Sequence, residues 1–191
     1  MNYTFISGIP ASGKSYLAGK IAKAVGAAHI ETDKWREEMK RDNKLRKWVD
    51  FFRDKNEVEY WDVTNCNEHW KNIKNQSEAF WPVILKNIKK IQKSGKPAIF
   101  EGVNILPHLA AKDLLFPGIF LLGDSYEVVF ERNKKDPRWG KTEKLQKKEA
   151  EAFFYCERLK YKEEAEKYGF KVFFNIKNAE EELLKIFKYE I

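Results

Sequence analysis

Cysteine and histidine are scarce in this chain of 191 residues, and their scarcity excludes several kinds of site. Cys66 and Cys156 are the two cysteines, and neither their number nor their spacing fits a disulfide framework or a zinc site, so we expect two reduced thiols. The three histidines are far apart in sequence, and no two have the spacing that places metal ligands on one helix face. We therefore expect them to pack in the protein or to lie at its surface.

Long apolar runs are missing as well. No segment has the roughly twenty apolar residues that a helix needs to span a bilayer. The first residues lead directly into a strand-like pattern, without the basic segment and apolar stretch of a secretory signal. We expect a cytoplasmic protein with no membrane partner.

Positive charge is in excess but is not concentrated in one block. The formal net charge is +7 and the isoelectric point is about 9.2, and lysines occur in nearly every helix-like segment. This distribution indicates lysines on the solvent-exposed faces of helices. A nucleic-acid partner is therefore compatible with the composition but is not favoured. The same excess suits a site that holds nucleotide and substrate phosphates together.

Short apolar runs alternate with longer segments of helical periodicity along the chain. Parallel strands are joined by long crossovers and covered on both faces, so continuous apolar runs are typical of them. The pattern predicts an α/β protein of three layers, with a mainly parallel five-stranded sheet and one domain over residues 1–191. The expected strands are Tyr3 to Ile6, Ala28 to Ile30, Ala98 to Val103, Ile119 to Leu122 and Lys171 to Phe174.

The segment 34–95 is much longer than an ordinary connection between a strand and a helix. It contains no obvious strand, so we expect a helical insert on the substrate side. Ser77 is the expected N-cap of its last helix, and Gly95 the expected end. The tryptophans of this insert favour a small aromatic core, although one or two would also suit a substrate pocket. They are Trp35, Trp48, Trp61, Trp70 and Trp81.

The most specific motif lies near the N-terminus, where residues 8–15 read G-I-P-A-S-G-K-S between an expected strand and an expected helix. Its glycines let backbone N–H groups surround phosphate oxygens, Lys14 is expected to reach the terminal phosphates, and the Ser15 hydroxyl is the expected Mg²⁺ ligand. The alternative is a glycine-rich turn, which requires neither the lysine nor the hydroxyl group. The residues expected to bind the nucleotide are Gly8, Ile9, Pro10, Ala11, Ser12, Gly13, Lys14, Ser15 and Tyr16.

A carboxylate and a guanidinium group follow the second expected strand. Asp33 comes just after the strand and Arg36 three residues later, at the sheet edge where α/β proteins bind ligands. Asp33 is the candidate to accept a proton from an attacking hydroxyl or to position it, and Arg36 the candidate to bind a substrate phosphate or carboxylate. The alternatives are an N-cap for Asp33 and a surface ion pair for Arg36.

The third expected strand contains an acidic residue, Glu101, which we expect near its end and facing the metal, because a carboxylate is costly to bury among apolar residues. Gly102 would allow a substrate to approach the backbone closely. Asn104 would donate or accept a substrate hydrogen bond, with a loop cap as the alternative.

Residues 132–142 are polar and basic and are interrupted by Pro137 and Gly140, so we expect a lid that closes over bound phosphates. Arg132 and Arg138 are its candidates for stabilising the charge of phosphoryl transfer. Arg158, in the helix-like stretch 144–168, is a further candidate to contact the substrate. A solvated loop and surface charges are the alternatives.

These segments together resemble the small P-loop kinases related to nucleoside monophosphate kinases, and most closely the 2-phosphoglycerate kinase-like proteins. The likeness is carried by the phosphate motif, by residues 31–36, by Glu101 to Pro107, by the lid and by Arg158 to Gly169. It implies that Lys14 and Ser15 bind phosphate and Mg²⁺ and that Asp33 serves the acceptor hydroxyl. It also implies that Arg132 begins the lid and that Arg158 contacts phosphate. The tryptophan-rich insert departs from the family pattern.

The sequence thus predicts a kinase that uses ATP and Mg²⁺ to phosphorylate a hydroxyl or phosphate of a small-molecule acceptor. Two alternatives stay open, a polynucleotide 5′-hydroxyl kinase and a non-catalytic ATP-binding regulatory module. The identity of the acceptor, the choice between ATP and GTP, and the oligomeric state are open as well.

Overall fold

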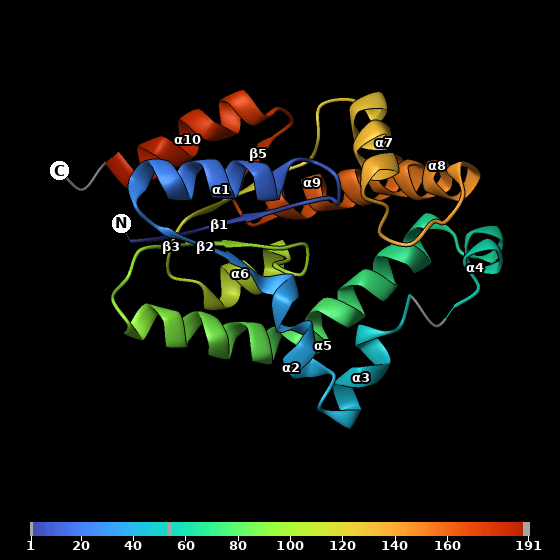
Figure 1. Ribbon diagram of the computed structural model, residues 1–191, viewed down its shortest axis with the longest axis horizontal. Helices are drawn as coiled ribbons and strands as arrows, with labels where there is room; N and C mark the ends of the chain where they lie inside the picture. The colour runs from blue at the N-terminus through green and yellow to red at the C-terminus, as the bar shows by residue number, and fades with distance from the viewer. Residues whose placement is uncertain (1, 53–54, 189–191) are drawn as a thin grey trace.

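Five short strands form one parallel sheet in the computed structural model, which describes residues 2–52 and 55–188 (Figure 1). The spatial order is β2-β3-β1-β4-β5, and every neighbouring pair is parallel. All five expected strands are confirmed, with ends that differ by one or two residues. Their bounds are β1 Tyr3–Ser7, β2 Ala28–Glu31, β3 Ala98–Glu101, β4 Gly118–Leu121 and β5 Lys171–Phe173.

Helices cover both faces of the sheet and make it the middle of three layers (Figure 1). Successive side chains of a strand point to opposite faces. Phe5, Phe100 and Phe120 pack in the core shared with α5, α6 and α9, whereas Ile6 and Ile99 pack beneath α1 and α10. The predicted three-layer α/β fold is therefore confirmed. The helices on the two faces are α1 Lys14–Val25, α5 Cys66–Lys93, α6 Pro107–Asp113, α9 Arg158–Lys167 and α10 Ile176–Lys188.

The segment between β2 and β3 is helical in its described residues. It comprises the 3₁₀ turn η1 Thr32–Trp35 and helices α2 Arg36–Met39, α3 Asn43–Val49, α4 Glu57–Val63 and α5. The long helix α5 carries the chain back toward the sheet (Figure 1). The expected N-cap at Ser77 is wrong: α5 begins at Cys66, and Asn65 and Glu68 form a reciprocal capping box there. Ser77 is buried inside the helix.

The loop that the sequence predicts as a lid is shorter than expected. Residues 132–135 belong to α7 Tyr126–Lys135, which Ser125 caps, so the expected loop is wrong for its first four residues. Val129 and Asn133 form the buried side of this helix, and their burial continues the helix into the basic segment. The chain then passes through 136–142 into a nearly continuous helical rod. The rod consists of α8 Glu143–Glu151, the π-helical turn η2 Ala152–Glu157 and α9.

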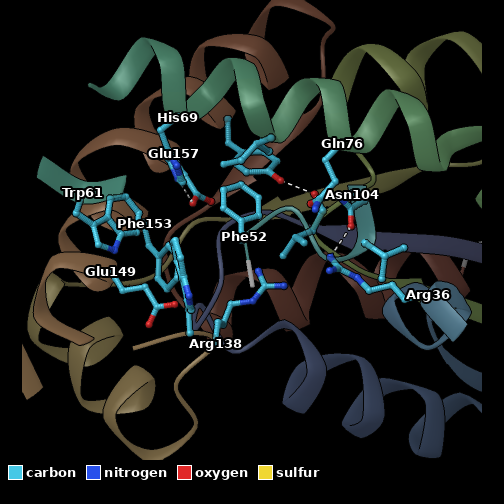
Figure 2. Close-up of a pocket in the computed structure, with 15 residues that line it drawn as sticks. Arg36, Phe52, Trp61, His69, Gln76, Asn104, Arg138, Glu149, Phe153 and Glu157 are labelled. Carbon is cyan, nitrogen blue, oxygen red and sulfur yellow. Dashed lines mark hydrogen bonds and ion pairs between the residues drawn. The ribbon is translucent and has the colours of Figure 1, made fainter. Parts of the chain in front are cut away.

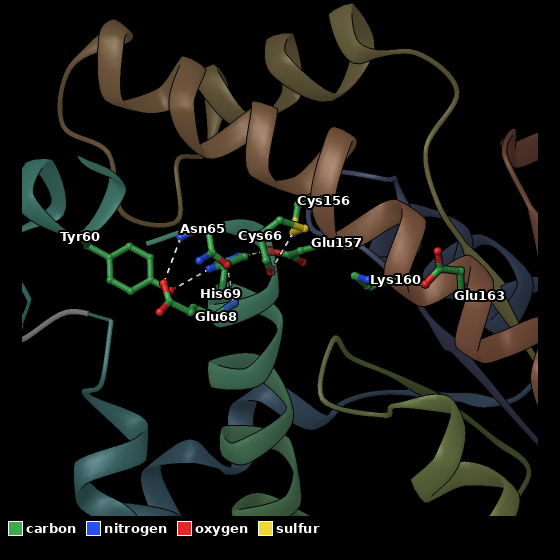
Figure 3. Close-up of a disulfide and its surroundings, with 9 residues drawn as sticks. All are labelled: Tyr60, Asn65, Cys66, Glu68, His69, Cys156, Glu157, Lys160 and Glu163. Carbon is green, nitrogen blue, oxygen red and sulfur yellow. Dashed lines mark hydrogen bonds and ion pairs between the residues drawn. A yellow bond between two sulfur atoms is a disulfide. The ribbon is translucent and has the colours of Figure 1, made fainter. Parts of the chain in front are cut away.

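Cys66 and Cys156 form a disulfide, so the expectation of two reduced thiols is wrong (Figure 3). Cys66 is the first residue of α5, and Cys156 lies in η2. The two residues are 90 positions apart in sequence, and packing of α5 against η2 brings their Cα atoms to 5.5 Å. Sequence spacing contains no signal for such a pair, because its proximity depends on how two distant helices pack.

Within the described ranges, no helix combines the length and the apolar character that crossing a membrane would require.

Candidate active site

The loop between β1 and α1 forms a cradle of backbone groups. Gly8 has φ +127° and Gly13 has φ +99°, and Ala11 is also left-handed with φ +56°. A Cβ on Gly8 would lie 2.1 Å from the carbonyl oxygen of Leu121 in the neighbouring strand β4, so that position admits no side chain. The loop leads into α1, whose first N–H groups lack helical partners and attract anions. The residues present therefore fit a polyphosphate.

Lys14 is folded into this cradle. Its ammonium group donates to the carbonyl oxygen of Ile9 at 2.6 Å and to the Ser12 hydroxyl at 3.5 Å. Burial lowers the pKa of Lys14, and the carboxylate of Glu101 opposes this shift. The charges of Arg138 and Asp33 also act on the pKa of Lys14, so these groups lie within its electrostatic reach. Lys14 thus lies where the charges of Glu101, Asp33 and Arg138 all act on it.

Ser15 and Glu101 meet beside the cradle. The Ser15 hydroxyl donates to Oε2 of Glu101 at 3.0 Å, and Nε2 of His29 lies 3.8 Å from the same oxygen. Glu101 ends β3, which pairs with β1, so the sheet register brings the carboxylate to the first turn of α1. A hydroxyl and a carboxylate are the hard oxygen donors that Mg²⁺ prefers. The donor set thus fits the ion that the motif implies.

Asp33 lies between two guanidinium groups. Its Oδ1 is 3.7 Å from Nη2 of Arg36, and its Oδ2 is 3.8 Å from Nη2 of Arg138. Asp33 belongs to η1 at the end of β2, whereas Arg138 lies in the loop between α7 and α8, so the fold joins residues that are far apart in sequence. The structure thus brings together three of the predicted site residues.

Asn104 holds Arg36 in place. Its Oδ1 accepts from Nη2 of Arg36 at 3.1 Å, and its Nδ2 donates to the Ser77 hydroxyl at 2.9 Å. The side chain is buried, so a direct role toward substrate stays a prediction. At Gly102 a Cβ would lie 1.9 Å from the hydroxyl oxygen of Thr32, so the close approach that this glycine permits is made by the chain itself.

The other two arginines lie in different surroundings. Arg132 donates through Nη1 to the carbonyl oxygens of Ser12 at 2.8 Å and Ala11 at 3.3 Å, so it contacts the cradle. Arg158 stacks on the rings of Phe154 and Phe174, at 4.4 and 4.7 Å from their centroids. It does not line the cavity described next, and burial lowers its pKa.

A cavity of about 130 Å³ opens next to Asp33 and its arginines, between the insert and the α8–η2–α9 rod. Figure 2 shows Trp61, Glu149, Glu157 and His69 on one side of it and Arg36, Asn104 and Gln76 on the other. Phe52 and Arg138 lie between these two sides in the same view. The lining residues are Arg36, Val49, Phe52, Trp61, His69, Ile73, Gln76, Val103, Asn104, Arg138, Trp139, Glu149, Phe153, Glu157 and Tyr161.

Most of this lining was not predicted from sequence. Trp61 fits the expectation that one or two tryptophans of the insert would line a pocket. A further signal was present: Glu149, Phe153, Glu157 and Tyr161 recur every four residues along the rod. In an ordinary α-helix, with about 3.6 residues per turn, residues spaced by four positions drift progressively around the helix axis. The π-helical turn η2 has more residues per turn, so it keeps these side chains on one side of the rod. The two acidic residues in this otherwise apolar series were the sequence signal that could have identified this wall of the cavity.

The five-stranded parallel sheet, covered by helices on both faces, and the cradle after β1 define a P-loop kinase fold. No protein-family model and no curated protein matches the sequence. The fold is similar to "Shikimate kinase from Acinetobacter baumannii in complex with shikimate", with 14% identity and a TM-score of 0.56. That match covers 99% of this chain and 92% of that chain.

Two further solved structures have the same fold. A shikimate kinase from Bacteroides thetaiotaomicron is 14% identical with a TM-score of 0.55, over 96% of this chain and 97% of that one. A deoxyadenosine kinase from M.mycoides with bound dATP is 15% identical with a TM-score of 0.50, over 97% and 98% of the two chains. At such identities the likeness shows the fold alone, and the resemblance to 2-phosphoglycerate kinase-like proteins stays a prediction.

Proposed function

We propose that the protein is a kinase that uses ATP and Mg²⁺ to phosphorylate a small-molecule acceptor on a hydroxyl or phosphate group. One observation carries the proposal: the fold brings Asp33 and Arg138 to 3.8 Å from each other, close enough to the phosphate cradle for their charges to act on Lys14. Donor and acceptor groups therefore share one electrostatic field. The solved structures with this fold are kinases of small molecules, which supports the proposal.

For a hydroxyl acceptor the residues have distinct tasks. The acceptor oxygen bonds to the γ-phosphorus while the bond from that phosphorus to the bridging oxygen of ADP breaks, and Asp33 takes the hydroxyl proton. Lys14, Arg36 and Arg138 stabilise the charge spread over the transferred group. Mg²⁺, when bound, neutralises phosphate charge, and Ser15 and Glu101 are the groups suited to hold it.

The cavity favours a small acceptor over a polynucleotide end. Its volume of about 130 Å³ and its aromatic lining suit a compact molecule. A non-catalytic ATP-binding module would leave Asp33 and its two arginines without a task. Strongly salt-dependent binding of single strands would instead favour the polynucleotide alternative.

Two substitutions test the proposal. Lys14→Ala should abolish transfer and weaken Mg²⁺-dependent ATP binding, because it removes the cation of the cradle. Asp33→Asn should leave ATP affinity unchanged and slow transfer by about 10²- to 10⁴-fold, the range of general base catalysis. Labelled ATP with a panel of sugars, hydroxy acids, nucleotides, amino alcohols and oligonucleotides measures transfer. Asp62→Asn, at an exposed position of the insert, is the matched control.

Each part of the proposal has its own contrary result. Parental turnover in Asp33→Asn would show that this residue is not the base. Absence of Mg²⁺-dependent affinity for any purine triphosphate would contradict the function as a whole.

A further inference from the structure

The acceptor cavity contains two buried carboxylates on the side away from Arg36. Glu149 of α8 is 2% exposed and Glu157 of η2 is 4% exposed, and both line the cavity (Figure 2). Acidic side chains are almost never so deeply buried without a partner. The catalytic arrangement proposed above uses neither of them.

Both carboxylates have hydrogen-bond partners among the described residues. Nε2 of His69 lies 2.9 Å from Glu157, and Nδ1 of His69 lies 2.8 Å from the Tyr60 hydroxyl. Asn133 donates to Glu149 at 2.9 Å. Across residues 2–52 and 55–188, no lysine or arginine nitrogen lies within 4.0 Å of either carboxylate.

The arginines of the cavity are engaged elsewhere. Arg36 and Arg138 both approach Asp33, and Arg36 also donates to Asn104. Burial raises the pKa of Glu149, even though Asn133 and Arg138 act in the opposite direction. The negative charge at the far side of the cavity is thus only partly compensated, and an uncompensated buried charge is costly.

Aromatic rings surround the same part of the cavity. The ring centroids of Trp61 and Trp139 are 6.0 Å apart, and those of Phe52 and Trp139 are 6.1 Å apart. Phe153 adds a fourth ring to the lining. The face of an aromatic ring attracts ammonium groups, most strongly where water is excluded. The carboxylates and the aromatic rings therefore both favour a positively charged group on the ligand, although they do so by different interactions.

We propose that the acceptor is an amino alcohol whose ammonium group binds Glu149, Glu157 and the rings of Trp61 and Trp139, with its hydroxyl directed to Asp33. This inference rests on the proposed kinase function and names its substrate class. The arginine side of the cavity receives the transferred phosphoryl group, and the acidic side receives the cation. In the reaction the hydroxyl oxygen bonds to the γ-phosphorus, ADP leaves, and Asp33 takes the proton.

Matched acceptors that differ in charge alone provide the test. Choline and its neutral isostere 3,3-dimethylbutan-1-ol form one pair, and linear amino alcohols and diols of two to six carbons form a series. ADP release by the full chain with ATP and Mg²⁺ measures turnover. Intrinsic tryptophan fluorescence in the presence of ADP, to which Trp61 and Trp139 contribute, measures acceptor binding. The charged members should bind and react at least about tenfold better than their neutral partners, as expected for a desolvated cation–π contact.

Substitutions locate the effect in the cavity. Glu149→Gln and Glu157→Gln should each reduce the preference for the charged acceptor about tenfold or more while leaving ATP affinity unchanged. Glu143→Gln, an exposed position on the same helix α8, should keep the full preference. Unchanged ATP affinity also shows that each variant is folded.

The outcomes separate the two proposals. Equal or better binding and turnover of neutral alcohols or anionic hydroxy acids would overturn the amino-alcohol inference and leave the kinase standing. Failure of every amino alcohol to bind, in protein that binds ATP, would overturn it as well. Absence of Mg²⁺-dependent ATP binding would instead overturn the kinase proposal itself.

Discussion

Breaking the Cys66–Cys156 disulfide should lower the stability of the whole domain. The bond links the start of α5 to η2 across 90 positions of sequence, so it closes a large loop of the unfolded chain. Cys66 is exposed, whereas Cys156 is buried. Cys66→Ser is therefore the substitution that removes the link with the least disturbance of packing.

The size of the effect follows from the length of the loop. In the chain-entropy description, a link across about 90 residues lowers the entropy of the unfolded chain enough to stabilise the fold by about 4.6 kcal/mol at 25 °C. For a chain of this size, each kcal/mol shifts the melting temperature by about 2–4 °C. Loss of the bond should thus lower the melting temperature by roughly 9–18 °C.

Circular dichroism melts with and without a phosphine reductant measure the shift. The reduced parent and Cys66→Ser should melt together, well below the oxidised parent, and the reductant should not affect the variant. Asn67→Ser, at the next exposed position, controls for the substitution itself. A melting temperature for Cys66→Ser within about 2 °C of the oxidised parent would refute the loop-entropy reasoning.

Three other changes test separate parts of the structure. Burial raises the pKa of Glu149, so its contribution to stability is fully present below the ordinary glutamate pKa of about 4.3 and is lost as the pH rises through the raised value. Glu149→Gln should therefore gain stability over the parent between pH 4 and 8 in melting curves, and a difference that does not depend on pH would contradict this. Gly8→Ala should weaken both folding and ATP binding, because its Cβ would lie 2.1 Å from the carbonyl oxygen of Leu121; parental ATP affinity by calorimetry would count against it. Ile84→Ala should lower the free energy of unfolding in urea by about 2–5 kcal/mol, since Ile84 of α5 is buried in the hydrophobic core. A loss below about 1 kcal/mol would show that the core collapses around the gap.

Features that depend on short stretches of sequence were predictable. The cradle needs eight consecutive residues, and each strand is a short apolar run, so both were evident without a structure. The approach of Asp33 to Arg36 also follows from local spacing, because η1 and α2 place them one turn apart. The capping box of Asn65 and Glu68 was equally local, and the choice of Ser77 overlooked it.

Features that depend on the packing of distant helices were not predictable. Cys66 meets Cys156, and His69 meets Glu157, because α5 packs against the α8–η2–α9 rod. No spacing in the sequence encodes that contact. The same packing forms the cavity wall, so this wall was the least predictable part of the candidate site. The loop predicted to begin at Arg132 begins only after Lys135, because buried Asn133 belongs to α7.

The insert is one continuous segment between β2 and β3, and this position affects how such a protein can evolve. The chain leaves the sheet after Glu31 and re-enters it at Ala98, and β2 and β3 are neighbours. The loop between β1 and α1 and Glu101 lie outside this excursion, whereas Phe52, Trp61 and several other residues that line the cavity lie within it. Exchange of that one segment between homologous chains, with Asp33 and Arg36 kept, would therefore reshape one wall of the cavity while Glu149 and Glu157 of the α8–η2–α9 rod stay in place.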